Sequence, residues 1–241
     1  MSPPNELSAI DFVNPYLSAR RQWVCTQLAN ALPNTLTKLM SSDPGTRAKF
    51  EDWTGQSQSK LETAWTNEGF KRATTPEERQ KGVWIRNGGG AVTTSCEGLI
   101  GTLFRKIEAA GHGHRAKTGT AATSFSLCGC DKWGKEPDKP VVGWHWFSER
   151  SRSVHPRAGD FFQVGIPAGE KRWELRHVGV ITGYAEGDTP EWETVEAGQG
   201  GPSAGADWMQ RKPWRPVNPV DKRNMKKVLM GWLDIDEHFG G

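Results

Sequence analysis

The sequence has no features that would place the protein in a membrane or on nucleic acid. No apolar run approaches the ~20 residues that a helix needs to cross a bilayer, so we expect no membrane insertion. Lys and Arg number 31 against 28 Asp and Glu, and no basic tract stands out, so we expect no nucleic-acid partner. Residues 1–17 also lack the basic and apolar regions of a signal peptide. We therefore expect synthesis in the cytoplasm without such a peptide.

Cysteine is scarce, and the four that occur are Cys25, Cys96, Cys128 and Cys130. They are too few and too scattered in 241 residues to predict a disulfide framework, so each is judged by its own chemistry. His112-Gly113-His114 and Cys128-Gly129-Cys130 offer the residue types that bind metals, but their spacing does not match structural zinc sites. We expect a surface loop there, and neither a metal nor a cofactor.

Tryptophan, in contrast, is abundant, with twelve in the chain. A group in helix-like or strand-like runs is expected in the core, namely Trp23, Trp53, Trp65, Trp192 and Trp232. A second group near turn-rich sequence is expected to line a cleft, namely Trp144, Trp146, Trp208 and Trp214.

Residues 1–82 have the apolar spacing and capping signals of helices, and we expect this helical region to pack on a catalytic core. One helix is predicted from Asn14-Pro15 up to Pro33, and a short one over 35–40. A third opens at Asp43-Pro44. The remaining signals are the i, i+4 pair Leu61 and Trp65 and the capping box of Thr75 with Glu78.

Residues 83–241 have the pattern of strands that follow one another closely. The predicted strands span 141–147, 160–164, 177–184, 192–197 and 228–235. Strands in succession after helices predict an α+β fold with an antiparallel sheet. The segment 111–139 is rich in Gly, Lys and Ser and is predicted to be an inserted loop, and 198–221 is predicted to be a loop before the last strand.

Cys96 is the strongest candidate for a reactive residue. The apolar positions that follow it lie on its own face of a helix that would begin at the cysteine, and they are Leu99, Ile100, Leu103, Phe104 and Ile107. The partial positive charge and free N–H groups of a helix N-terminus stabilise a thiolate and an oxyanion. The alternative is an inert buried cysteine.

His177 is the candidate general base, because it begins the apolar run His177-Val178-Gly179-Val180-Ile181. The turn-rich segment 186–190 predicts a hairpin with the next strand. Pairing about its centre brings either Glu196 or Gln199 directly opposite His177, where it would orient the imidazole. Asp160, in a Gly-Asp turn that enters a strand, is expected to bond backbone groups rather than act in catalysis.

These residues together resemble the NlpC and CHAP families of papain-like cysteine peptidases and amidases. The matching segments are Thr94-Ser95-Cys96-Glu97-Gly98-Leu99-Ile100, Pro156-Arg157-Ala158-Gly159-Asp160-Phe161-Phe162, His177-Val178-Gly179-Val180-Ile181 and Val195-Glu196-Ala197. Cysteine, Gly-Asp turn, histidine and polar third residue follow in the family's order, over roughly 83–235. The resemblance implies a papain-like fold with the nucleophile helix packed on the antiparallel sheet.

The resemblance also implies hydrolysis of amide bonds in the stem peptides of bacterial peptidoglycan. Cys96 would attack the carbonyl, His177 would transfer the proton and Glu196 would hold the ring. The chain departs from CHAP proteins, which carry an Asn shortly after the Glu where this chain has Gly198 and Gln199, and from NlpC proteins with a second histidine. The third catalytic role is therefore open between Glu196 and Gln199.

An enzyme that acts on the cell wall but lacks a signal peptide needs another route out of the cytoplasm. We expect a toxin that a type VI-like secretion system delivers to the periplasm or cell wall of a rival bacterium, with an immunity protein or a secretion-system carrier as partner. The alternatives are a phage endolysin, a papain-like binding protein without turnover, and a cytosolic cysteine protease or transferase.

Overall fold

The computed structural model describes residues 17–86, 88, 92–116, 122–139, 141–151, 153–217 and 228–240. Its helices are α1 (Ala19–Ala31), α2 (Arg47–Thr54), α3 (Gln58–Asn67), α4 (Pro76–Lys81), α5 (Cys96–Ala109) and α6 (Ile235–His238), with the 3₁₀ turns η2 (Phe147–Glu149) and η3 (Pro202–Ala204). Its strands are β1 (Lys38–Met40), β2 (Lys71–Arg72), β3 (Trp84–Ile85), β4 (Trp144–Trp146), β5 (Phe161–Gly169), β6 (Arg172–Ala185), β7 (Glu191–Glu196), β8 (Trp208–Pro216) and β9 (Val228–Leu233).

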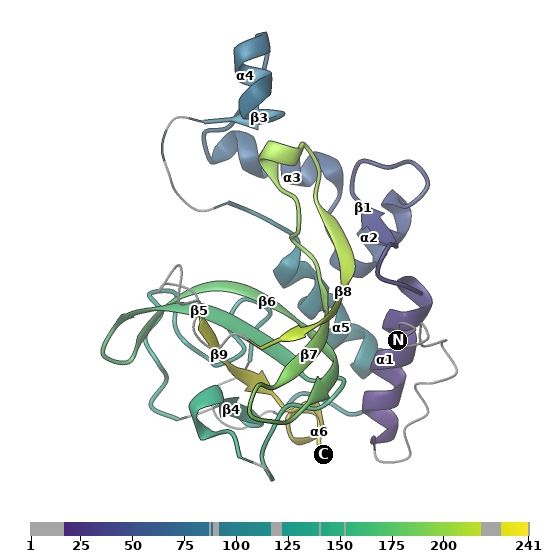
Figure 1. Ribbon diagram of the computed structural model, residues 1–241, viewed down its shortest axis with the longest axis vertical. Coiled ribbons are helices and arrows are strands. Elements are labelled where there is room, and N and C mark those ends of the chain that lie inside the picture. The colour runs from purple at the N-terminus through teal and green to yellow at the C-terminus, as the bar shows by residue number, and fades with distance from the viewer. Residues whose placement is uncertain are drawn as a thin grey trace.

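The centre of the fold is one antiparallel sheet with strand order β1-β8-β7-β6-β5-β9-β4 (Figure 1). Helices and a large antiparallel sheet together make the α+β class, as predicted. The hairpin of β6 and β7 was also predicted and is confirmed.

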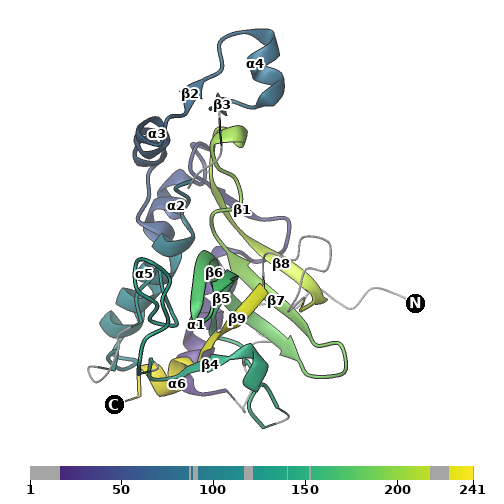
Figure 2. The same cartoon turned by 90° about the vertical axis from the view of Figure 1, so that its left-hand side faces the viewer.

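The two faces of the sheet are buried by different sets of side chains, because neighbours along a strand point to opposite faces. Phe161 and Val180 belong to the main core, which includes the apolar face of α5. Phe162 and Ile181, one position on, belong to a smaller cluster with Trp232. Figure 2 shows α5 on one side of the strands.

The N-terminal helices are joined to this sheet by a strand and by buried ion pairs. β1 pairs with β8 at the edge of the sheet. Arg21 of α1 is 1% exposed and lies 2.6 Å from Asp160, 2.7 Å from Asp234 and 2.7 Å from Asp236. A guanidinium with several carboxylate partners is stabilised where an unpaired one would not be. The described part of the N-terminal region, residues 17–82, therefore shares the sheet and its polar contacts with the remainder of the described chain.

Two predicted elements differ from the structure. The short helix expected over 35–40 is wrong, because 38–40 is strand β1. Residues 198–221, expected as a loop, contain β8, whose hydrogen bonds run to β7 and β1. Both segments lack a strong apolar alternation, so it is pairing with neighbouring strands that makes them strands. The start of the first helix at Asn14-Pro15 lies outside the described residues.

The paired strands β2 and β3, and helix α4 that connects them, project from the body of the molecule (Figures 1 and 2). The predicted capping box is present, since Thr75 and Glu78 bond each other's backbone N–H groups. None of the residues of α4 is buried. Capping therefore supports this helix in place of core packing.

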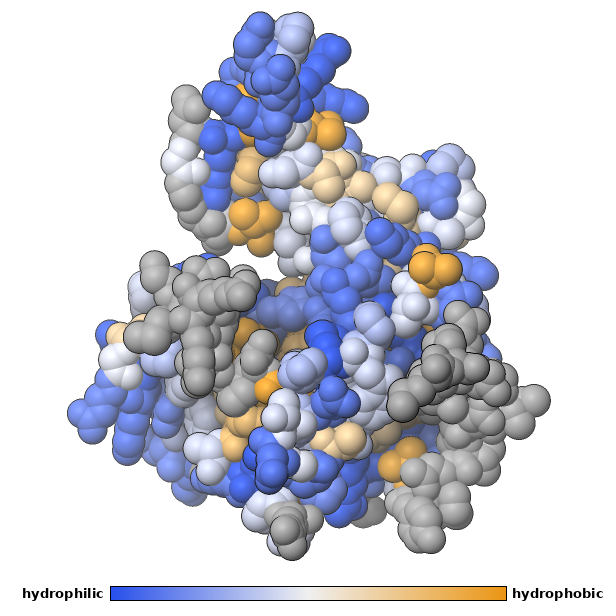
Figure 3. Space-filling model, in the orientation of Figure 1, coloured by the Kyte–Doolittle hydropathy of each residue, from blue (hydrophilic) through white to orange (hydrophobic). Residues whose placement is uncertain are grey.

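The surface shown in Figure 3 is mostly hydrophilic, with small separate apolar areas. Within the described part of the chain, no helix combines the length and the apolar character of a membrane span. Of the tryptophans expected in the core, Trp53, Trp65, Trp192 and Trp232 are buried and Trp23 is partly buried against it.

Candidate active site

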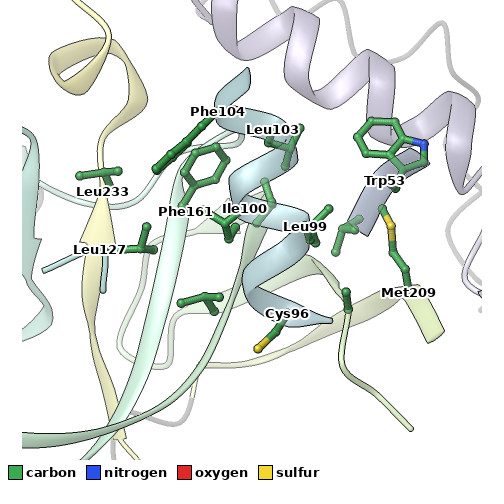
Figure 4. Packing of buried hydrophobic residues seen from close by; sticks show 14 of the residues in the cluster. Trp53, Cys96, Leu99, Ile100, Leu103, Phe104, Leu127, Phe161, Met209 and Leu233 are labelled. Atoms are coloured by element: carbon green, nitrogen blue, oxygen red, sulfur yellow. The ribbon is translucent and has the colours of Figure 1, made fainter. Parts of the chain in front are cut away.

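Cys96 is the first residue of α5, as its sequence predicted. The apolar face that follows it packs into the main core, and Figure 4 shows Leu99, Ile100 and Phe104 among residues of the sheet. Ser95 precedes the helix but makes no side-chain cap. Its hydroxyl instead accepts a hydrogen bond of 3.0 Å from the Gly198 N–H. The first N–H groups of α5 thus receive no bond from Ser95, and the positive end of the helix lies beside the sulfur.

His177 lies between Cys96 and Glu196. Its Nε2 is 3.1 Å from Oε2 of Glu196, and Cys96 is close enough to the ring to raise the pKa of the imidazole. Since Nε2 faces Glu196, Nδ1 is the ring nitrogen left to exchange a proton with the thiol. The structure thus brings together the three residues that the sequence singled out, from α5, β6 and β7.

The charges of His177 and Glu196 stabilise each other. Burial lowers the pKa of His177, but the hydrogen bonds with Cys96 and Glu196 outweigh it and raise the pKa to about 9. Burial raises the pKa of Glu196, but the hydrogen bond and positive charge of His177 lower it to about 2. At neutral pH the imidazole is therefore protonated beside an ionised carboxylate.

The register that would place Gln199 opposite His177 is present only beside the turn, where Tyr184 pairs with Trp192, and the register for Glu196 is not formed. Val180 pairs with Val195, and Ile181 with Thr194, before a bulge interrupts the ladder. Continued in the other direction, this register puts Gly198 opposite His177, rather than Glu196 or Gln199. Glu196 reaches the ring diagonally on the same face, as residues two positions away can do in an antiparallel pair.

Glu196 is held by groups that the sequence analysis did not single out. Its Oε1 accepts hydrogen bonds from Thr194 Oγ1 at 2.6 Å and from Arg215 at 2.6 Å. Gln199 Nε2 donates to Oε2 over 3.1 Å. The hydrogen bonds of the Gln199 side chain thus run to Glu196 and to the carbonyl of Ala197. Thr194, two positions before Glu196 in a strand, could have been found from side-chain alternation, but Arg215 could not.

Asp207 and Gly198 fix the turn that carries the nucleophile. Oδ2 of Asp207 accepts a hydrogen bond of 2.7 Å from the N–H of Ser95, and Oδ1 accepts hydrogen bonds from the N–H groups of Gly200 and Trp208. Gly198 has φ 76°, and a Cβ there would lie 2.8 Å from Oγ1 of Thr94. Only glycine suits both constraints. The Gly-rich sequence around Gly198 is the signal that could have pointed to it.

A cleft of about 320 Å³ opens beside the three residues. It is lined by Gln56, Glu68, Val92, Thr93, Thr94, Cys96, Glu97, Gly98, Phe125, Gln163, Leu175, Arg176, His177 and Val178. Burial raises the pKa of Glu97. The cleft therefore has acidic and basic side chains in the same lining as Cys96, and its volume suits a small peptide segment.

No family is assigned by comparison. A scan against protein-family models, a search of curated proteins and a search of solved structures each gave no significant match. Function is therefore argued from the geometry of the site and from the motifs.

The other residues singled out lie elsewhere. Cys128 and Cys130, expected in a surface loop, are buried, because the turn that carries them packs into the main core. His112 packs against Trp23, and His114 is exposed. Of the tryptophans expected to line a cleft, Trp144 and Trp146 line a separate pocket that includes Cys128.

Asp160 bonds backbone groups, as expected, through the N–H of Arg157 and of Ile235. Among the described residues, the one group of three potential metal ligands comprises His145, Asp234 and Glu237. Asp234 in that group already pairs with a guanidinium and caps α6.

Proposed function

We propose that this protein is a cysteine hydrolase that cleaves amide bonds, with Cys96 as nucleophile, His177 as acid and base, and Glu196 as the residue that orients the imidazole. The observation that carries the proposal is the chain of contacts from a helix-terminal thiol to His177 and from Nε2 of that ring to Glu196. A buried cysteine without a catalytic role needs neither a protonated imidazole nor an aligned carboxylate.

In the first half of the reaction the sulfur of Cys96 attacks the carbonyl carbon of the amide. The electron pair of the carbonyl moves to oxygen, where N–H groups at the start of α5 can stabilise it. His177 then donates its proton to the amide nitrogen, the C–N bond breaks, and the amine leaves. A thioester remains on Cys96.

In the second half a water molecule attacks the thioester, and His177 accepts its proton. The C–S bond breaks, the carboxylic acid leaves, and the sulfur and imidazole return to their starting protonation. Glu196 stabilises the positive charge of the ring, and Arg215 and Thr194 hold Glu196 in place. The fold we propose for this machinery is papain-like, consistent with a nucleophile helix packed on an antiparallel sheet.

The substrate we propose is the stem peptide of bacterial peptidoglycan. The motifs that resemble NlpC and CHAP proteins support this choice. The cleft supports it through charge, since Glu68, Glu97 and Arg176 line it and a stem peptide carries both amine and carboxylate groups. The flanking acidic and basic side chains would bind these groups on either side of the scissile amide.

Digestion of purified sacculi tests the reaction. The full-length protein should release soluble fragments, and mass spectrometry of these fragments identifies the bond that is cut. Cys96→Ala should be folded and inactive, whereas Cys25→Ala, which removes a buried thiol outside the cleft, should remain active. Activity of Cys96→Ala near that of the unmodified protein would refute the proposal.

Delivery to a rival cell by a type VI-like system is proposed together with the substrate. Expression in a bacterial host separates this from action on cytoplasmic proteins. A version fused to an export signal should lyse the host, the cytoplasmic version should not, and exported Cys96→Ala should be harmless. Toxicity restricted to the cytoplasmic version would instead favour a protease or transferase with protein substrates.

A further inference from the structure

Cys128 and Cys130 form a pair of thiols outside the cleft of Cys96. Their sulfur atoms lie 3.2 Å apart, and both residues are buried. The turn between them is tight, because Gly129 has φ 78° and its N–H bonds the carbonyl of Ser126. A glycine at the centre lets the two side chains approach, since this backbone conformation is strained for other residues.

Of the two cysteines, Cys128 is the one that lines a pocket. A pocket of about 270 Å³ is lined by Cys128, Glu136, Pro137, Trp144, Trp146 and Glu149. Cys130 is not part of this lining. A small molecule that enters this pocket would therefore lie beside Cys128, with Trp144 and Trp146 in the same lining.

The shared hydrogen bond gives the two thiols different acidities. The bond with Cys130 lowers the pKa of Cys128 to about 7, against the effect of burial. The same bond, together with burial and the charges of Glu136 and Asp131, raises the pKa of Cys130. A reactive thiolate next to a thiol that keeps its proton is the arrangement of an attacking and a resolving cysteine.

We propose that Cys128 and Cys130 are a redox site that exchanges with disulfide compounds, with Cys128 as the attacking and Cys130 as the resolving thiol. The thiolate of Cys128 attacks one sulfur of the incoming disulfide, and the other sulfur leaves as a thiolate that takes up a proton. Cys130 then loses its proton and attacks Cys128, which releases the second thiol. The products are an intrachain disulfide and two thiols, so the incoming disulfide accepts the two electrons.

The pair is attached to the wall of the cleft through Gln163. The side-chain oxygen of Gln163 accepts hydrogen bonds from the N–H groups of Leu127 and Cys128, at 2.9 and 3.3 Å. Its amide donates to the carbonyl of Phe125, and both Gln163 and Phe125 line the cleft. The redox site and the proposed active site thus share one turn of the chain.

The test uses the full-length protein and glutathione. The protein is incubated with oxidised glutathione, quenched with acid, and alkylated in denaturant before digestion with trypsin. Cleavage after Lys117 and Lys132 gives one peptide that carries both cysteines and no others. We expect this peptide to resist alkylation and to be lighter by two hydrogen atoms, and an excess of reduced glutathione to restore the dithiol.

Single variants test the order of attack. Cys130→Ser should stop at a mixed disulfide of glutathione with Cys128, and Cys128→Ser should form far less mixed disulfide at Cys130. The peptide of Cys25, a buried thiol whose pKa burial raises to about 12, is the internal control and should be alkylated throughout. None of these readouts depends on the hydrolase activity.

Three results would overturn the proposal. In the first, the peptide of the unmodified protein stays a dithiol in oxidised glutathione. This measurement does not depend on the folding of any variant. The second is a disulfide that joins either cysteine to Cys25 or Cys96 instead. The third is a disulfide that excess reduced glutathione does not open, which would make the bond a structural one.

Discussion

Replacement of Glu196 by Gln changes the charge beside His177 while it keeps the size of the side chain. The pKa of His177 is raised from 6.5 to about 9. Since a shift of one pKa unit corresponds to about 1.4 kcal/mol, the surroundings stabilise the imidazolium by about 3 kcal/mol. Cys96 and Glu196 share this stabilisation against the effect of burial. Loss of the carboxylate, with the guanidinium of Arg215 left nearby, should lower the pKa of His177 by at least about one unit.

The pH dependence of kcat/KM measures this change. His177 must be protonated to donate to the leaving amine, so activity falls as pH rises through its pKa. In the unmodified protein this alkaline limb should lie near pH 9, and in Glu196→Gln it should move to lower pH by about one unit or more. Glu196→Ala, which also loses the hydrogen bond to the ring, should lower kcat by roughly ten- to a thousandfold.

Gln199→Ala is the matched control, because Gln199 donates to the carboxylate oxygen that faces Nε2 of the ring. It should leave the alkaline limb nearly in place and reduce kcat less than Glu196→Ala does. A limb that Glu196→Gln does not move, with the fold intact by thermal melt, would refute the role given to the carboxylate. A crippled Gln199→Ala beside a nearly normal Glu196→Ala would assign the third role to the amide.

Other predictions concern stability and the turn at the nucleophile. Gly198→Ala should lower both kcat and Tm, since its backbone is left-handed and a methyl group would clash with Thr94, which precedes the nucleophile. Gly187→Ala is the control and should change neither, because the space around Gly187 is open. Arg21→Met should lower the free energy of unfolding by about 3 to 5 kcal/mol and Tm by roughly 10 °C, because it leaves buried carboxylates unpaired. Lys71→Ala removes an exposed ion pair and should scarcely change the melting curve. The pKa of His177 is raised in the folded state, so its protonation contributes stability in full below pH 6.5, and this contribution is lost as pH rises towards about 9. Tm should therefore decline between these pH values in the unmodified protein. A decline of the same size in His177→Gln would contradict the assignment to His177.

Local patterns predicted the elements whose signals lie within one segment. The apolar spacing after Cys96 predicted both the start of α5 and its buried face, because a period near 3.6 places those side chains on one side of a helix. Thr75 and Glu78 predicted their capping box for a similar reason, since all of its bonds are made within four residues. The turn before β7 predicted the hairpin.

The contact between His177 and Glu196 shows where such patterns stop. The expected pairing of the two strands narrowed the third residue to Glu196 or Gln199, but neither of them lies directly opposite His177. The bulge between Ile181 and Gly183 shifts the pairing, and although a glycine within a strand indicates a bulge, it does not fix the register beyond it. Glu196 reaches the ring by a diagonal contact instead.

The sequence by itself determined the helix that carries Cys96, the strand that carries His177 and the α+β class, because each depends on neighbours a few positions apart. Tertiary structure alone decided which side chains complete the site. Asp207 lies 112 positions from the Ser95 N–H that it holds, and Arg215 lies 19 positions from Glu196. Contacts between such distant positions form only when the whole sheet assembles, since their geometry depends on strand order, register and the packing of α5 on the sheet.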